Sequence, residues 1–162
     1  MLSLDKHAIF PALLLAGAMS SGQAAPVDSA DLDIILNVPE PTQYVRLPDS
    51  WAGRVNTMIF DRAQRRFFLP VALLTLRNDS GGFSATLETA PELAGQETSI
   101  PLTVSVCGKR LSTTGATGVL TPDAHRGVPF ACPVEIRSSA VPENQPPGDY
   151  SGVIVMKFSA TS

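Results

Sequence analysis

The sequence predicts an antiparallel β-sandwich, and three observations carry this prediction. Apolar and polar residues alternate with a period of two along several short segments, as in strands with one buried face. Clusters of Pro, Gly, Asn, Asp and Ser, which favour turns, separate these segments, while helical periodicity is nearly absent. One pair of cysteines supplies a single disulfide, which suits a small sandwich of short strands.

The expected strands differ in how they are buried. Leu69–Leu76 is almost wholly apolar, so we expect a strand that is covered on both faces or lies centrally in its sheet. Only Thr89–Glu97 has room for a helical turn, and Pro91 limits it. The alternating segments, each predicted to bury one face, are Leu32–Val38, Phe83–Glu88, Ile100–Cys107 and Tyr150–Ser159.

The first 24 residues are predicted to be a signal peptide. Lys6 precedes an apolar run that is too short to span a bilayer, and Gly22 and Ala24 supply the small residues of a cleavage site. Cleavage after Ala24 leaves 138 of the 162 residues, which is enough for one domain. We therefore expect an exported mature chain.

The charge of the mature chain is nearly balanced. Removal of Asp5 and Lys6 with the signal peptide leaves 11 basic and 14 acidic residues, a net charge of −3. Proteins that bind nucleic acid carry a basic patch or stripe, and this balance provides none. We expect no nucleic-acid partner.

Cys107 and Cys132 form an even pair in a chain destined for an oxidising compartment, so a disulfide is predicted. It would close a loop of 26 residues and stabilise the fold by about 3.5 kcal/mol on the chain-entropy model. Strand alternation gives the two cysteines conflicting faces, which a strand end or a bulge would reconcile. A metal site is not expected, because Cys-x-x-Cys spacing is absent and only His125 remains as a histidine ligand.

The sequence offers no catalytic constellation. His125 stands in a turn-like segment, and no Gly-x-Ser-x-Gly motif accompanies it. Ser80-Gly81-Gly82 lacks the lysine of a phosphate-binding loop and fits a hairpin turn better. We predict that the protein is not an enzyme, with no catalytic residues and no cofactor.

Two segments leave alternatives open. Arg62, Arg65 and Arg66 form the one basic cluster, which is either an exposed loop or a ligand patch for sulfate, carboxylate or sialic acid groups. Ala25–Val38 alternates cleanly and stops at Pro39. It is either the first strand of an ordinary sandwich or a strand that completes the sheet of another subunit.

Three collinear segments carry a family resemblance. Pro147–Val153, with the sequence Pro-Gly-Asp-Tyr-Ser-Gly-Val, is the most telling, and Ala90–Leu93 precedes Ile100–Val106 and then Gly108–Thr114. In these segments the chain resembles the pilins of the alpha-class chaperone–usher fimbriae, of the colonisation-factor-antigen type. The best-known major pilins of this type lack cysteine, so the resemblance leaves open whether this is a major, a minor or a tip subunit.

The resemblance implies an incomplete immunoglobulin-like β-sandwich that lacks its last strand. Residues 25–39 would be a donor-strand extension and residues 40–162 the pilin domain. The extension would insert into a neighbouring subunit instead of its own domain. The donor residues would be Leu32, Ile34, Leu36 and Val38, and the strand that edges the groove would present Tyr150, Ile154, Met156 and Phe158.

The resemblance also implies a function and partners. The protein would be a structural subunit of a surface fimbria, exported through the periplasm, polymerising by donor-strand exchange and supporting adhesion. Its partners would be neighbouring pilin subunits, a periplasmic fimbrial chaperone, an outer-membrane usher and a host-surface receptor. The alternative is a stand-alone secreted β-sandwich module that binds a surface ligand without polymerising.

Overall fold

The computed structural model describes residues 29–37, 43–120 and 125–162; the predicted signal peptide, Val38 and Pro39 lie outside them. These described residues form strands and no helix, and so no helix that could cross a membrane. The strands are β1 (Ser29–Asn37), β2 (Tyr44–Arg46), β3 (Asn56–Asp61), β4 (Arg66–Phe68), β5 (Ala72–Arg77), β6 (Gly82–Leu87), β7 (Glu92–Ala94), β8 (Ser99–Val106), β9 (Lys109–Arg110), β10 (Thr117–Leu120), β11 (Phe130–Ser138) and β12 (Tyr150–Thr161).

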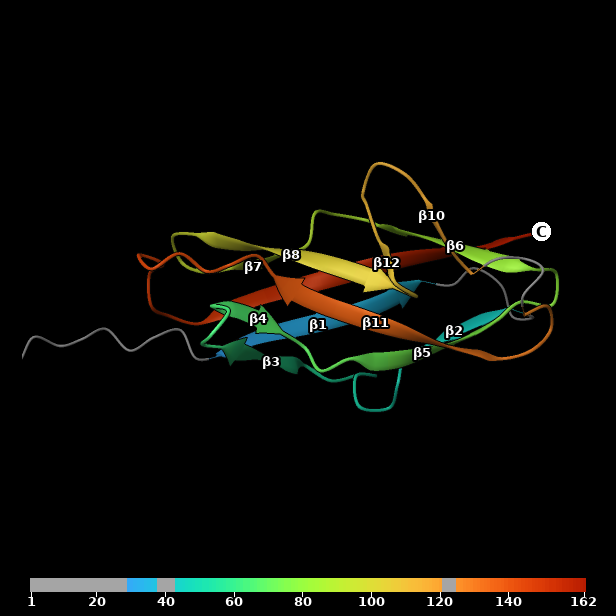
Figure 1. The fold of residues 1–162 in the computed structure, drawn as a ribbon, viewed down its shortest axis with the longest axis horizontal. Helices are drawn as coiled ribbons and strands as arrows, with labels where there is room; N and C mark the ends of the chain where they lie inside the picture. Colours follow the sequence, from blue (N-terminus) through green and yellow to red (C-terminus); the bar gives the residue numbers. More distant parts are fainter. Residues whose placement is uncertain (1–28, 38–42, 121–124) are drawn as a thin grey trace, which may run out of the picture.

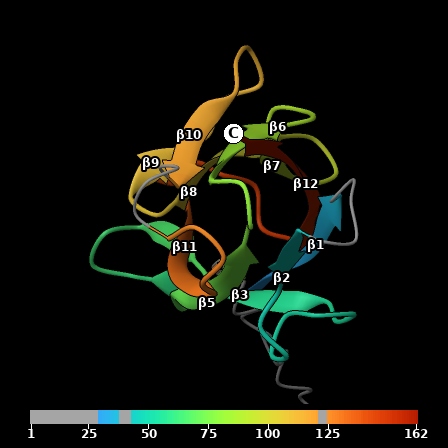
Figure 2. The ribbon, with the colours of Figure 1, turned by 90° about the vertical axis from the view of Figure 1, so that its right-hand side faces the viewer.

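The strands form a sandwich whose layers join along their sides. Hydrogen bonding follows the order β2-β5-β11-β4-β3-β1-β12-β7-β8-β9, and an additional pairing of β11 with β8 closes the path. β6 pairs with β12 and carries β10. Seen along the strands in Figure 2, the elements surround one common interior. The predicted all-β sandwich is confirmed.

The core follows from the predicted alternation. In β8, Ile100, Leu102, Val104 and Val106 are buried, and the residues between them are exposed or half-buried. Successive side chains of a strand point to opposite faces, so each such strand contributes one apolar row to the interior. The largest fully buried side chains are Phe67, Phe83, Phe158, Leu32, Met58, Leu74, Leu76, Leu93, Ile100, Ile136, Ile154 and Met156.

The helical turn expected within Thr89–Glu97 is wrong, because the chain forms β7 there. Leu93 is fully buried and pairs with Ile100 of β8, while Ala94 pairs with Ser151 of β12. Three residues are too few to show a strand period. The hydrogen bonds that make this segment extended come from β8, the next strand in the chain, and from β12, which is distant in sequence.

The apolar segment Leu69–Leu76 lies centrally, as β5 pairs with β2 on one edge and β11 on the other. The alternative expectation, that both faces are covered, is wrong. Val71 is 62% exposed and Leu73 is 54% exposed. The neighbouring strands satisfy the edges of β5, but among the described residues no element covers its outer face.

Candidate functional site

The first described strand, β1, lies between β3 and β12, the last strand of the chain (Figure 1). We call the space between β3 and β12 that β1 fills the groove. It runs antiparallel to β3 and parallel to β12. Leu32 stands opposite Asn56 on one side and Gly152 on the other. Both edges of β1 are therefore hydrogen-bonded, and the strand occupies an interior position in the sheet.

The inward face of β1 is apolar. Ala30, Leu32 and Ile34 are no more than 5% exposed, and Leu36 is half-buried against the core. Full burial of a branched side chain such as Leu32 or Ile34 contributes about 1.5–3 kcal/mol. The side chains that point outward and are exposed are those of Asp31, Asp33 and Ile35.

The strand β12 forms one wall of this groove. Its residues Tyr150, Ile154, Met156 and Phe158 are all buried, on the face that the sequence indicated. Ile154 lies opposite Ile34, and Met156 lies opposite Leu36. Cross-strand neighbours of this kind are in side-chain contact, so the groove is matched to the apolar row of β1.

Tyr150 anchors the start of β12 by its hydroxyl group. The hydroxyl donates to the carbonyl oxygen of Pro146 at 2.8 Å and accepts from Nε2 of Gln145 at 2.8 Å. Its oxygen also lies 3.2 Å from Oγ1 of Thr98. Buried tyrosines usually find such partners, and here they tie β12 to the loop before it. The alternating sequence pattern predicted that Tyr150 is buried, but nothing in the sequence indicated these hydrogen bonds.

The predicted disulfide between Cys107 and Cys132 is confirmed, with the two Cα atoms 5.1 Å apart. Cys107 follows the last residue of β8 and has a φ of 49°, and Gly108 continues the turn with a φ of 73°. The left-handed turn ends the alternation of β8, which resolves the conflict of faces. Cys107 N–H also donates to the carbonyl oxygen of Pro133 at 2.9 Å, which holds the turn beside β11.

The three arginines of the basic cluster lie in the hairpin formed by β3 and β4, and their side chains have different surroundings. Arg65 has a φ of 52°, and its Nε donates to the carbonyl oxygen of Val141 at 3.1 Å. Arg62 is exposed in the turn, whereas Arg66 is half-buried in β4. The three side chains therefore have different surroundings.

His125 has a packing partner. Its ring is half-buried and stacks on Phe130, with ring centroids 4.0 Å apart. Across residues 29–37, 43–120 and 125–162, no group of three or more His, Cys, Asp or Glu side chains could hold a metal ion.

Asn78 is a structural residue that sequence reasoning missed. Its side chain is fully buried, although it stands in a predicted turn. Its Nδ2 donates to the carbonyl oxygens of Gly82 and Thr161, and its Oδ1 accepts from Ser80 N–H at 2.8 Å. The asparagine thus ties the turn before β6 to the end of β12, although these segments are far apart in sequence.

Comparisons with known proteins identify the family of the chain. The family of CS1 type fimbrial major subunits matches residues 28–159, and the chain belongs to this family. Among solved structures, the CooA pilin subunit from enterotoxigenic Escherichia coli aligns with a TM-score of 0.40 and 15% identity, covering 88% of this chain and 95% of that one. No curated protein matches the chain.

Family membership defines the class of protein. The chain is a structural subunit of a fimbria, a surface fibre in which it associates with other pilin subunits, and it is not an enzyme. This favours the assembling subunit over the stand-alone binding module. The groove that β1 fills is the candidate site for that association.

Proposed function

We propose that the subunit polymerises by donor-strand exchange, in which residues 25–39 of one copy fill the groove between β3 and β12 of the next. The observation that carries this proposal is the place of β1, a segment near the N-terminus that occupies an interior position between β3 and the last strand, β12. Every copy has the same segment and the same groove. An identical element is exchanged between copies at low cost, because the same strand pairing and burial form again between two chains.

The proposal also explains why assembly would need helper proteins. Without β1, the apolar side chains of Ile154 and Met156 would lose their cover, and β3 and β12 would each present an unpaired edge. An open edge beside exposed apolar surface promotes aggregation. A periplasmic chaperone would cover the groove until an outer-membrane usher brings the donor segment of the next subunit.

Within the single chain, β1 pairs with its own β3 and β12, so closure within the subunit competes with exchange. The distinguishing question is whether the strand and the groove that it fills belong to one chain or to two. Ile35 is 45% exposed and stands opposite Val155 of β12, so cysteines at these positions would report that pairing. Insertion into a neighbouring subunit stays a prediction until this is tested.

The experiment mixes Ile35→Cys subunits with Val155→Cys subunits during fibre assembly. We expect disulfide-linked dimers that contain one chain of each kind on a non-reducing gel. Val153→Cys and Lys157→Cys, on the same face of β12, cover the case in which the exchanged strand adopts another register. The contrary result is a disulfide that forms only within single chains of the Ile35→Cys/Val155→Cys double variant, with no link between two chains. That result would show that β1 stays in its own domain and would refute exchange.

A further inference from the structure

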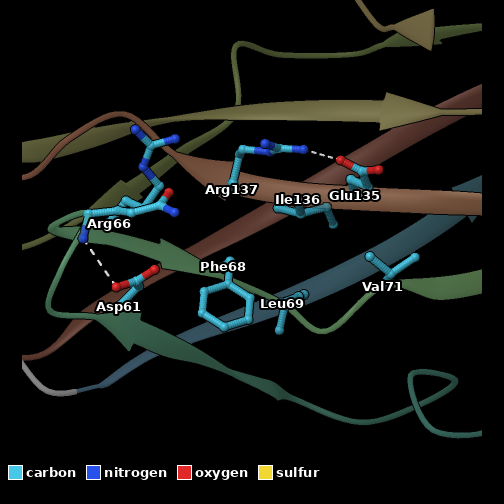
Figure 3. Close-up of a pocket in the computed structure, with 9 residues that line it drawn as sticks. Asp61, Arg66, Phe68, Leu69, Val71, Glu135, Ile136 and Arg137 are labelled. Carbon is cyan, nitrogen blue, oxygen red and sulfur yellow. Dashed lines mark hydrogen bonds and ion pairs between the residues drawn. The ribbon is translucent and has the colours of Figure 1, made fainter. Parts of the chain in front are cut away.

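The described residues form several recesses, among them a surface hollow and the groove of β1. The hollow has a volume of about 230 Å³, opens between β4, β5 and β11, and is lined in part by Arg66 (Figure 3). Glu135 accepts a hydrogen bond from Arg137 there, and Asp61 accepts the backbone N–H group of Gln64 at 3.1 Å. The two acids of the hollow are therefore used within the chain, whereas the groove takes up a whole strand.

The first row of side chains across the groove has room for a small residue of β1. Ala30 stands opposite Met58 of β3 on one side and opposite Tyr150 of β12 on the other. All three residues are buried. Neighbouring strands of a sheet lie about 5 Å apart, so residues that stand opposite one another on one face are in contact. Two long side chains therefore flank the single methyl group of Ala30.

The ring of Tyr150 is held in place in two ways. Its hydroxyl group makes the hydrogen bonds with Thr98, Gln145 and Pro146 that anchor the start of β12. The ring also packs against the backbone of Gly95, since a Cβ atom at position 95 would lie 2.5 Å from Cε1 of the ring. A larger side chain at position 30 would therefore meet a ring that is already fixed.

The second row across the groove has the opposite pattern of sizes. Leu32 is fully buried and stands opposite Asn56 of β3 and Gly152 of β12. The side chain of Asn56 donates from Nδ2 to the carbonyl oxygen of Arg54 at 3.0 Å, and Gly152 has no side chain. The large apolar side chain of this row therefore belongs to β1.

The two rows together fix the register of β1. A slip by two residues keeps the apolar face of a strand inward, so the alternating pattern alone does not prevent it. A slip in one direction would place Leu32 between Met58 and Tyr150, where it would be overpacked. A slip in the other direction would place Ala30 beside Gly152 and leave a cavity. The groove therefore discriminates between segments that share the same alternation.

We propose that the groove selects its donor strand by size at two positions, with a small residue at position 30 and a large aliphatic residue at position 32. We call this rule size selection. Met58 and Tyr150 exclude a larger side chain from the first position, and Gly152 leaves the second position to a large one. The N-terminal segment of a second copy of this chain meets both conditions. The inference rests on the proposed function, because it states which donor strand the exchange accepts.

The experiment repeats the mixed assembly with one donor side chain enlarged. Donor subunits carry Ile35→Cys with or without Ala30→Leu, and acceptor subunits carry Val155→Cys. We expect Ala30→Leu to lower the yield of linked dimers by about tenfold or more, because the walls of the groove must move to admit the leucine. Met58→Ala in the acceptor should restore the yield, since it removes about the volume that the leucine adds. An unchanged yield for Ala30→Leu would overturn the proposal.

Asp33→Leu in the donor is the matched control. It introduces the same residue into the same strand, but the side chain of Asp33 is exposed and points away from the groove. The yield of linked dimers should therefore stay unchanged. An equal loss of yield for Asp33→Leu and Ala30→Leu would show that the walls of the groove do not select the donor by size.

Denaturant unfolding of the single subunit, in which β1 fills its own groove, separates size selection from strand exchange. Ala30→Leu should lower the unfolding midpoint, and the double variant Ala30→Leu/Met58→Ala should recover most of the loss. If the midpoints behave in this way but no link forms between two chains, exchange is refuted and size selection holds within one chain. If links form equally well with both donors and the midpoints do not change, size selection is refuted and exchange stands.

Discussion

Leu32 of β1 stands opposite Gly152 of β12 in a parallel register, at the point where β12 also passes beside β7. Leu32 is fully buried there. A Cβ atom at position 152 would meet the backbone carbonyl of Glu92 well inside van der Waals contact. The absence of a side chain at Gly152 therefore lets three strands come together.

The first prediction follows from this close approach. Gly152→Ala should destabilise the mature subunit by about 1–3 kcal/mol, because a backbone group must move to make room. Gly118→Ala is the matched control, since a Cβ there meets nothing within 4 Å. Denaturant unfolding monitored by circular dichroism measures both. Equal stability of the two variants would show that the close approach of β7 to Gly152 does not affect the free energy of unfolding.

A second prediction concerns neighbouring residues on opposite faces of β1. Ile34 is 5% exposed and Ile35 is 45% exposed. Ile34→Asp should cost at least about 3 kcal/mol, because it places a carboxylate in an apolar groove. Ile35→Asp introduces the same charge into water and should change stability by less than about 1 kcal/mol. Thermal melts of the two proteins give the comparison; similar melting temperatures would contradict the placement of β1.

The third prediction separates the segment from its groove. A chain that begins at residue 40 should aggregate or melt without cooperativity, because β3 and β12 are left with open edges. A synthetic peptide of residues 25–38 should restore a cooperative melt, and the peptide with Ile35→Asp should do so as well. The peptide with Ile34→Asp should fail. A shortened chain that is stable without any peptide would mean that the groove needs no donor.

The disulfide provides a fourth prediction. The mature protein should weigh two hydrogens less than its reduced form by mass spectrometry, as expected for the Cys107–Cys132 bond. The double variant Cys107→Ala/Cys132→Ala should lose about 2–5 kcal/mol of stability. Reduction of the unaltered protein serves as the control and should shift the unfolding midpoint in the same direction. Two free thiols in the exported protein would contradict the bond.

The fifth prediction tests the hydroxyl of Tyr150. Tyr150→Phe keeps the buried ring but leaves the carbonyl of Pro146 without its donor, which should cost about 1–2 kcal/mol. Tyr44→Phe is the control, because the hydroxyl of Tyr44 makes no hydrogen bond within the described residues, and it should be near neutral. Denaturant unfolding of both variants is the measurement. An unchanged unfolding midpoint for Tyr150→Phe would show that the packing of the ring, and not the hydroxyl group, holds the start of β12 in place.

The amino-acid sequence was sufficient to predict most of the core and most of the turns. Alternation correctly indicated the inward residues of β8 and β12, such as Val104 and Ile154, because the period of a strand is a local property of the backbone. The disulfide was predictable from two facts alone: the chain has an even pair of cysteines, and it is expected to be exported to an oxidising compartment. The collinear motifs indicated the family.

The choice of neighbouring strands, in contrast, depends on the tertiary structure. No local pattern states that β1 runs parallel to β12, that Leu93 belongs to a strand, or that Leu73 is exposed. The same holds for Arg65 and Arg66, which are adjacent in sequence, although one donates to the backbone of Val141 and the other lines a surface hollow. The alternating pattern of a segment predicts which face of the strand each residue lies on. Which strands pair, and which faces another element covers, depends on long-range contacts that a single segment does not encode.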